Sequence, residues 1–289
     1  MNIIFSINGG IGKCVLATSV CKAIKQQYPE DQLIVVSGYP EVFLNNPHVD
    51  RALAFGQMSY FYQDFIEGKE FKAFVHDPYV ETGFLKQNEH LSKTWAEMFG
   101  VKPAAPVPEL FLTDRELSFF SNKFASASPI LLLQTNGGAP QQELKYSWAR
   151  DIPSNVVADV LKEYHEQYNI VHIKREDQPG YVGTTPVSDG FRALCVLISL
   201  SDKRLLMDSF GQHAAAALDK PSSVLWIANT PAVFGYDIHN NIIANPFTKK
   251  PELRHAYLQK FDISGNLVEF PYNNETEIFN SKQVIDSLK

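Results

Sequence analysis

The sequence predicts an α/β protein made of two Rossmann-like domains with a cleft between them. Short uncharged strands alternate with helical stretches along the 289 residues, which is typical of parallel sheets joined by right-handed crossovers. The opening order of strand, Gly-Gly turn and helix returns from residue 130 onward. We therefore place a first domain in residues 1–125 and a second in residues 126–289, with ligands expected at the carboxyl ends of the strands.

The composition and the cysteine pattern indicate an ordinary globular protein. A net charge of −6 and 45% apolar residues are typical of a globular chain, and they argue against one whose main task is binding nucleic acid by charge. Cys14, Cys21 and Cys195 form no CxxC pair, and Cys14 and Cys21 are predicted to pack on one helix face as small apolar residues. The opening lacks a basic region and no apolar run spans a bilayer, so we expect a cytoplasmic protein without stable membrane insertion.

The first half opens with a β-branched strand over residues 3–7, whose lack of alternation is expected when both sheet faces are covered. A turn over 8–12 leads into a helix over 13–28 with apolar residues at three- and four-residue spacing, which Pro29 ends. The other elements expected here are strands 33–37, 51–55 and 71–76 and helices 60–67 and 89–99.

The segment 101–108 carries three prolines and is predicted to be a stiff link toward the second half. Thr113 and Glu116 then form a capping-box pattern for a helix that runs to about residue 124. The second half is expected to contain strands 130–134, 170–174, 204–207 and 222–228 and helices 153–168, 191–200, 210–218 and 275–288.

The turn after the first strand is a candidate anion site. Gly9, Gly10 and Gly12 let a ligand approach the backbone next to a helix N-terminus, and Lys13 follows them. The pattern is close to a deviant Walker motif, so a P-loop ATPase is one alternative. However, Cys14 stands where that motif has Thr, and a thiol is a poor ligand for Mg²⁺. A tight strand-to-helix turn without a ligand is equally compatible with these residues.

The segment that begins at Asp208 is the second candidate site. Asp208 ends a buried strand, and Ser209, Gly211 and His213 follow at the start of a helix. The carboxylate is suited to sugar hydroxyls, while the Ser209 hydroxyl and the amides of residues 209–212 are suited to a phosphate, with His213 in reach. The alternative is a structural helix cap with His213 packed against the sheet.

A basic and aromatic loop over residues 145–153 forms the third candidate, downstream of a turn at Asn136 and Gly137. Lys145 and Arg150 are suited to neutralise a diphosphate leaving group, which a metal would otherwise do. The alternative is a solvated loop with a surface pair between Arg150 and the following aspartate.

Lys174, at the end of a strand, is a weaker candidate for the same ligand. No DxD, HExxH or GxSxG motif and no metal-spaced Cys/His cluster occurs in the sequence, so no metal site is predicted.

Together these segments resemble glycosyltransferase family nine, the ADP-heptosyltransferase-like enzymes with the GT-B fold of two Rossmann-like domains. The most specific likeness is the run from Asp208 and Ser209 through His213 and the Ala-rich helix to Lys220-Pro221. The other matching segments are residues 12–19 with 28–29, 46–51, 131–138 and 145–153. The resemblance implies sugar transfer from a nucleotide sugar, a co-substrate, with inversion and without a required metal or cofactor.

By this resemblance, Asp208, Ser209 and His213 would hold the donor sugar and phosphates, and Lys145 would pair with the diphosphate. The family's proposed general base is an aspartate, and Lys13 stands in its place. Inverting transfer needs a group that takes the acceptor proton, and a lysine is mostly protonated unless strongly desolvated.

Lys13 is therefore expected to bind a phosphate, with Asp77 or His76 as base, although Asp77 is also a natural helix cap. In the expected function, the second half holds the nucleotide-sugar donor and the first half a hydroxyl acceptor, a surface saccharide. Three alternatives stay open: transfer to a hydroxymethylated DNA base, a deviant P-loop ATPase using Gly9–Lys13, and a non-catalytic nucleotide-sugar-binding protein.

Overall fold

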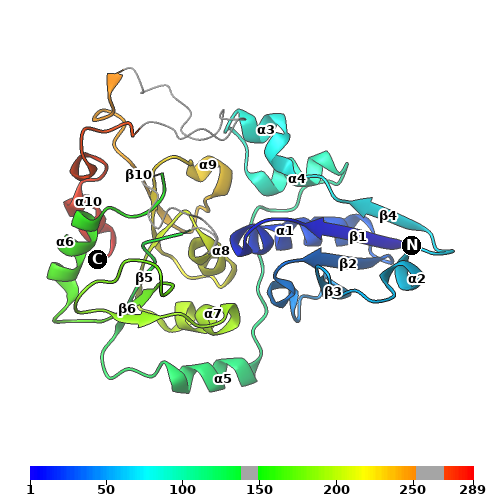
Figure 1. Ribbon diagram of the computed structural model, residues 1–289, viewed down its shortest axis with the longest axis horizontal. Helices are drawn as coiled ribbons and strands as arrows, with labels where there is room; N and C mark the ends of the chain where they lie inside the picture. Colours follow the sequence, from blue (N-terminus) through cyan, green and yellow to red (C-terminus); the bar gives the residue numbers. More distant parts are fainter. Residues whose placement is uncertain (138–148, 252–269) are drawn as a thin grey trace.

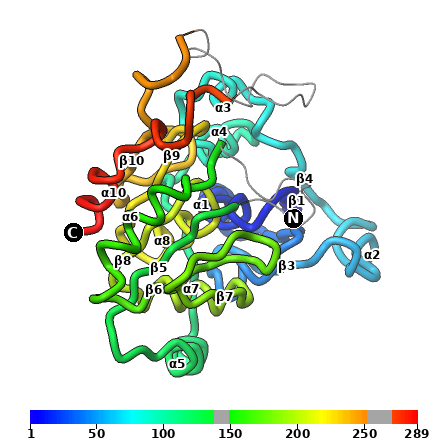
Figure 2. The backbone as a smooth tube through the Cα atoms, turned by 60° about the vertical axis from the view of Figure 1, so that its left-hand side comes forward, coloured from blue at the N-terminus to red at the C-terminus, as the bar shows by residue number. Residues whose placement is uncertain are grey.

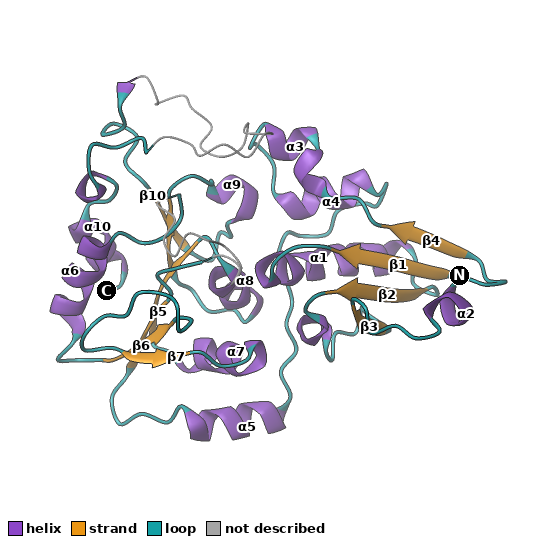
Figure 3. Ribbon diagram, viewed as in Figure 1, coloured by secondary structure: helices purple, strands orange, loops and turns teal. Residues whose placement is uncertain are grey.

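Two parallel sheets organise the computed structural model, which describes residues 1–137, 149–251 and 270–289 (Figure 1). The first sheet has the strand order β3-β2-β1-β4 and the second the order β10-β9-β8-β5-β6-β7, with every pair parallel. The predicted α/β class with two Rossmann-like sheets is confirmed. Figure 3 shows the strands of the two sheets well separated, with helices between them.

The strands of the first sheet are β1 (Asn2–Ile7), β2 (Gln32–Ser37), β3 (Arg51–Ala54) and β4 (Phe71–Phe74). Its helices are α1 (Ile11–Gln27), α2 (Phe61–Phe65), α3 (Thr82–Leu85) and α4 (Leu91–Met98), with short 3₁₀ helices η1 (Pro40–Phe43) and η2 (Pro78–Val80). Helix α5 (Asp114–Lys123) follows and carries the predicted capping box of Thr113 and Glu116.

The strands of the second sheet are β5 (Ile130–Leu133), β6 (Asn169–Ile173), β7 (Thr185–Val187), β8 (Lys203–Met207), β9 (Ser223–Trp226) and β10 (Asn240–Ile243). Its helices are α6 (Ser154–Tyr164), α7 (Phe191–Leu200), α8 (Phe210–Ala217), α9 (Pro231–Phe234) and α10 (Ser281–Ser287), with the 3₁₀ helix η4 (Glu275–Glu277).

One hydrophobic core joins the two halves. It runs from the inner face of the first sheet through α1 and α4 to α7, α8 and the facing side of the second sheet. A second cluster lies on the other side of the second sheet under α6 and α10, which pack together at the outer edge (Figure 2). Helix α1 is buried on nearly all sides between these layers, so Cys14 and Cys21 are fully buried core residues, as predicted.

The strand orders fix where polar side chains meet. Neighbouring strands leave in opposite directions at a switch point, between β1 and β4 in the first sheet and between β5 and β8 in the second. Ligands of open α/β sheets bind at such points, at the carboxyl ends of the strands. The residues after β1 and β4 and those after β5 and β8 are therefore the positions where chemistry is expected.

Several predicted boundaries are wrong. Helix α1 begins at Ile11, because Gly10 is already its N-cap, and the expected turn over 8–12 shortens to three residues. The helix expected over 153–168 ends at Tyr164, and the tail expected to be helical over 275–288 is helical only at 281–287 apart from η4.

Strands β7 and β10 and helix α9 were not predicted. Both strands are edges, and β7 contains a proline, which only an edge strand tolerates readily. The two asparagines that open β10 are equally atypical of a strand. Helix α9 spans only four residues and offers no hydrophobic periodicity to read.

Candidate functional site

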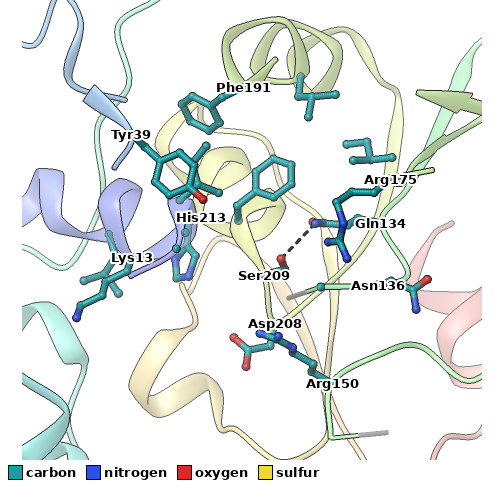
Figure 4. Close-up of a pocket in the computed structure, with 18 of the residues that line it drawn as sticks. Lys13, Tyr39, Gln134, Asn136, Arg150, Arg175, Phe191, Asp208, Ser209 and His213 are labelled. Carbon is teal, nitrogen blue, oxygen red and sulfur yellow. Dashed lines mark hydrogen bonds between the residues drawn. The ribbon is translucent and has the colours of Figure 1, made fainter. Parts of the chain in front are cut away.

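A cleft of about 590 Å³ lies where the two switch points face each other. Its walls come from the β1–α1 turn, from the segments after β5, β6 and β8, and from the first turns of α7 and α8 (Figure 4). This volume is in the range of small-molecule sites in proteins. Among the described residues no group of three His, Cys, Asp or Glu side chains is arranged to hold a metal ion.

The carboxylate side of the cleft is built at the end of β8. Asp208 is 8% exposed and accepts a hydrogen bond from the Asn229 amide, which follows β9. Ser209 is the N-cap residue of α8, and its Oγ accepts from Gln134 Nε2 at 3.2 Å. Asp208 thus lies beside the N-terminus of a helix, where unpaired N–H groups and the helix dipole favour an anion.

Gln134 ties the two strands of the switch point together. Its Nε2 binds Ser209 as above, and its Oε1 accepts from the backbone N–H of Gly211 at 3.1 Å. The Gly211 N–H that was expected to face a phosphate therefore has a protein partner. Gln134 was not singled out from the sequence, although a glutamine directly after the buried apolar strand β5 was the available signal.

Asp151 holds two residues of the loop after β5, Asn136 and Gly137, in place. This carboxylate is 2% exposed and accepts from Asn136 Nδ2 at 3.0 Å and from the backbone N–H of Gly137 at 3.1 Å. The interpretation of Arg150 and Asp151 as a solvated surface pair is therefore wrong: Asp151 turns inward because two amide donors satisfy it there. Asn136 borders the cleft, but its amide nitrogen is engaged with Asp151.

Two cationic side chains contribute positive charge to the cleft. Arg150 and Lys174 both border the cleft, and within the described residues no carboxylate lies in ion-pair distance of either side chain. A Cβ atom on Gly137 would lie 3.3 Å from Arg150 Nε and 3.4 Å from Ser209 Oγ. Glycine at position 137 therefore lets the guanidinium and the hydroxyl approach the same part of the cleft.

His213 lies where the two halves touch. It is 5% exposed, its Nδ1 is 2.7 Å from Tyr236 Oη, and it borders the cleft. Burial lowers the pKa of His213 to about 3, so the ring is neutral at neutral pH. A Cβ on Gly12 would lie 3.1 Å from His213 Cδ2 and 3.3 Å from the Phe210 backbone, so Gly12 permits the close approach of α1 and α8.

An ion pair occupies the first switch point. Lys13 is buried, and its Nζ is 2.6 Å from Asp77 Oδ2 and 4.5 Å from the Tyr79 ring centroid. Asp77 also caps η2 by accepting from the Tyr79 N–H at 3.0 Å, so the capping interpretation and the ion pair hold together. The Asp77 side chain is 44% exposed and so keeps access to solvent.

This arrangement differs from a phosphate cradle. The Lys13 ammonium is bonded to Asp77, and only Asn8, Gly9 and Gly10 separate β1 from α1. Burial raises the pKa of the Cys14 thiol to about 12, so the group after Lys13 is a neutral core thiol. These three features disfavour the P-loop alternative, which needs a longer loop, a free ammonium and a hard Mg²⁺ ligand.

The structure brings most of the sequence-predicted site residues to one cleft. Those that border it are Gly10, Gly12, Lys13, Asn136, Gly137, Arg150, Lys174, Asp208, Ser209 and His213. Asp77 forms an ion pair with Lys13, which borders the cleft, whereas Gly9 shapes the turn with φ of +118° and Gly211 binds Gln134. Lys145 lies outside the described residues. The exposed His76 is not among the residues that border the cleft.

Solved structures share this architecture, whereas no protein-family profile and no curated protein sequence matches the chain. E. coli ADP-heptose LPS heptosyltransferase II is 14% identical with a TM-score of 0.62, over 84% of this chain and 90% of that one. A glycosyltransferase family 9 protein from Veillonella parvula is 10% identical with a TM-score of 0.67, over 99% and 95%. E. coli heptosyltransferase WaaC, solved with ADP, is 11% identical with a TM-score of 0.55, over 85% and 94%.

These matches confirm, at the level of the fold, the resemblance to glycosyltransferase family nine. The chain has the heptosyltransferase-like GT-B architecture of two parallel sheets. Within the described ranges, no helix is both long and apolar enough to cross a bilayer.

Proposed function

We propose that this chain is a glycosyltransferase that moves a sugar from a nucleotide-sugar donor to a hydroxyl acceptor, with inversion and without a metal at the donor. One observation carries the proposal: Asp208, the N-terminal residues of α8, Arg150 and Lys174 all border one cleft. A sugar needs hydrogen-bond acceptors for its hydroxyls, and a diphosphate needs cations and N–H donors. This cleft offers both within the reach of a single ligand.

The second half holds the donor. Arg150 and Lys174 have no carboxylate partner in the described chain, so an anionic ligand supplies the charge that a partly buried cation otherwise lacks. As the diphosphate leaves, negative charge grows on its oxygens, and Arg150 and the α8 N-terminus stabilise it as a metal would. Asp208 binds the sugar hydroxyls. The Ser209 hydroxyl, held by Gln134, lies next to the phosphates.

The first half holds the acceptor. In the reaction, the acceptor oxygen forms a bond to the anomeric carbon while the bond from that carbon to the diphosphate breaks on the opposite face. The acceptor proton passes to Asp77, and the nucleoside diphosphate leaves. Lys13 keeps the Asp77 carboxylate in place through the 2.6 Å ion pair. Asp77 is the proposed base because its carboxylate is 44% exposed next to Lys13, whose ammonium cannot accept a proton.

The solved neighbours support this assignment. The two heptosyltransferases are named for ADP-heptose or were solved with ADP, so ADP-sugars are the first donors to test. The net charge of −6 favours a saccharide acceptor over hydroxymethylated DNA. Three buried free thiols agree with the proposed reducing, cytoplasmic location.

The test is a panel of nucleotide sugars scored by thermal shift and by release of nucleoside diphosphate, with and without EDTA. We expect one nucleotide class to raise the melting temperature and to be turned over in EDTA. Asp208→Asn should abolish both effects, whereas Lys13→Met should keep donor binding and lose turnover.

If Lys13→Met loses nucleotide binding while Asp208→Asn keeps it, the chain is an ATPase of the P-loop type. If the donor binds but is never hydrolysed or transferred, the protein is a non-catalytic binder.

A further inference from the structure

The loop between α9 and β10 packs against the first turn of α8. His239 Nε2 lies 2.8 Å from the Gln212 carbonyl oxygen, and because a carbonyl only accepts, this nitrogen is the donor. The backbone oxygen of Tyr236 accepts from Asn241 Nδ2 at 3.0 Å. Tyr236 and His239 are both nearly fully buried. The position of Tyr236 is therefore fixed relative to α8 by contacts other than its own hydroxyl.

The Tyr236 hydroxyl determines which nitrogen of His213 carries the proton. Its Oη is 2.7 Å from His213 Nδ1, the one acceptor for the phenol proton among the described residues. Burial raises the pKa of the Tyr236 phenol and lowers that of His213, so both groups are neutral and each has one proton. A buried hydroxyl that does not donate loses a hydrogen bond, so Tyr236 donates to Nδ1 and the His213 proton sits on Nε2.

The contacts of Gln212 are compatible with a proton on His213 Nε2. Its Nε2 is 3.1 Å from both ring nitrogens of His213, and a point equidistant from both lies off the ring plane, away from either lone pair. The same amide donates to the Phe234 carbonyl oxygen at 3.0 Å. Among the described residues, no group other than the Gln212 amide lies within hydrogen-bond distance of His213 Nε2.

The Nε2 edge of the ring faces the contact of the two halves. The neighbouring carbon, Cδ2, is the His213 atom that a Cβ on Gly12, at the start of α1, would meet at 3.1 Å. We propose that Tyr236 is a positioning residue that holds His213 as the Nε2–H tautomer, a neutral hydrogen-bond donor to a phosphate oxygen in the cleft. His213 then does not take the acceptor proton. The phosphate part of this proposal rests on the proposed function, whereas the tautomer does not.

The direct test is ¹⁵N NMR of histidine-labelled protein, with the His213 ring signals assigned by their loss in His213→Gln. In the wild type we expect a protonated Nε2 and an unprotonated, hydrogen-bonded Nδ1. In Tyr236→Phe we expect a mixture of tautomers. Tyr164→Phe is the matched control, because the Tyr164 phenol is also buried and donates to one acceptor, the Ile285 carbonyl, away from the cleft. It should leave the His213 signals unchanged.

Inorganic pyrophosphate is the probe for the phosphate contact. Tyr236→Phe should weaken its binding about two- to tenfold, the effect of one neutral hydrogen bond, and Tyr164→Phe should not. A wild-type His213 protonated on Nδ1, or a tautomer unchanged in Tyr236→Phe, would overturn the role of Tyr236, and the wild-type spectrum decides this even if the variant fails to fold. Absence of pyrophosphate binding in the wild type would instead overturn the proposed function and the phosphate contact.

Discussion

At the scale of single residues, the two sides of the cleft differ in whether the cation that borders it is paired with a carboxylate. Lys13 has its carboxylate partner in Asp77, so the acceptor side is neutral as a pair. Arg150 borders the donor side without such a partner in the described chain. An uncompensated guanidinium next to a helix N-terminus favours an anionic ligand and is the residue on which diphosphate affinity should depend most.

Arg150→Gln should reduce affinity for inorganic pyrophosphate by at least about tenfold, because a hydrogen bond to a charged group is stronger than a neutral one. Arg150→Lys keeps the charge but loses the forked geometry of the guanidinium, so its pyrophosphate affinity should lie between those of the wild type and Arg150→Gln. Isothermal titration measures the effect. The matched control is Arg115→Gln on the exposed side of α5, and equal affinities for the Arg150 and Arg115 variants would contradict the role of Arg150.

Gly137→Ala tests the close approach of Arg150 and Ser209. The new Cβ would lie 3.3 Å from Arg150 Nε and from Met207 Cε and 3.4 Å from Ser209 Oγ, so these side chains must give way by a few tenths of an ångström. We expect weaker pyrophosphate binding with only a small change in melting temperature, because the displaced groups border a cleft. Unchanged affinity would show that this part of the cleft does not contact the anion.

At the scale of elements, the two halves are joined by helix contacts that no sequence periodicity describes. Helix α1 packs against α8, and α5 against α7, where Arg192 forms two hydrogen bonds to Glu116. The sequence predicts α1 and its buried cysteines because a strand, a Gly-Gly turn and an apolar helix have strong local signals. It does not predict that α1 is covered on nearly all sides, because that depends on α8, almost 200 residues later.

Gly12→Ala should separate α1 from α8, since the new Cβ would meet His213 and the Phe210 backbone at 3.1–3.3 Å. Overpacking of this kind costs about 1–3 kcal/mol, so we expect a lower melting temperature and loss of turnover. Gly10→Ala is the control: its Cβ meets nothing within 4 Å and its φ is −78°. Equal stability of the two variants in thermal unfolding would contradict this account of the contact.

The pair of Glu116 and Arg192 should make stability depend on pH in the acid range. Arg192 holds the pKa of Glu116 down to about 2, against 4.5 for a free glutamate. Because the folded-state pKa is depressed, the stabilisation is present above about pH 4.5 and is lost as the pH falls toward 2. Urea unfolding should show a smaller acid loss in Glu116→Gln than in the wild type. Glu67→Gln, at an exposed position, should lose as much stability in acid as the wild type does. Parallel pH profiles of stability for all three proteins would show that the Glu116–Arg192 pair does not cause this loss.

At the scale of the whole molecule, the sequence predicts the fold class because each half repeats one strongly patterned unit. The sequence did not predict β7 and β10. Both are edge strands that are polar or contain a proline, and sequence patterns are weakest in such strands. The sequence points to residues of the candidate cleft where they adjoin a strand end, as Asp208 and Ser209 do. Gln134, Asp151 and Tyr236 were missed as site residues because their roles come from contacts between distant segments.

The most direct measurement is a crystal structure with a nucleotide sugar, or its non-transferable analogue, bound in the cleft. The account predicts the diphosphate between Arg150 and the N-terminus of α8, the sugar on Asp208, and an intact ion pair of Lys13 and Asp77. A nucleotide whose phosphates sit on Gly9–Lys13, with the Lys13 ammonium turned away from Asp77, would contradict it.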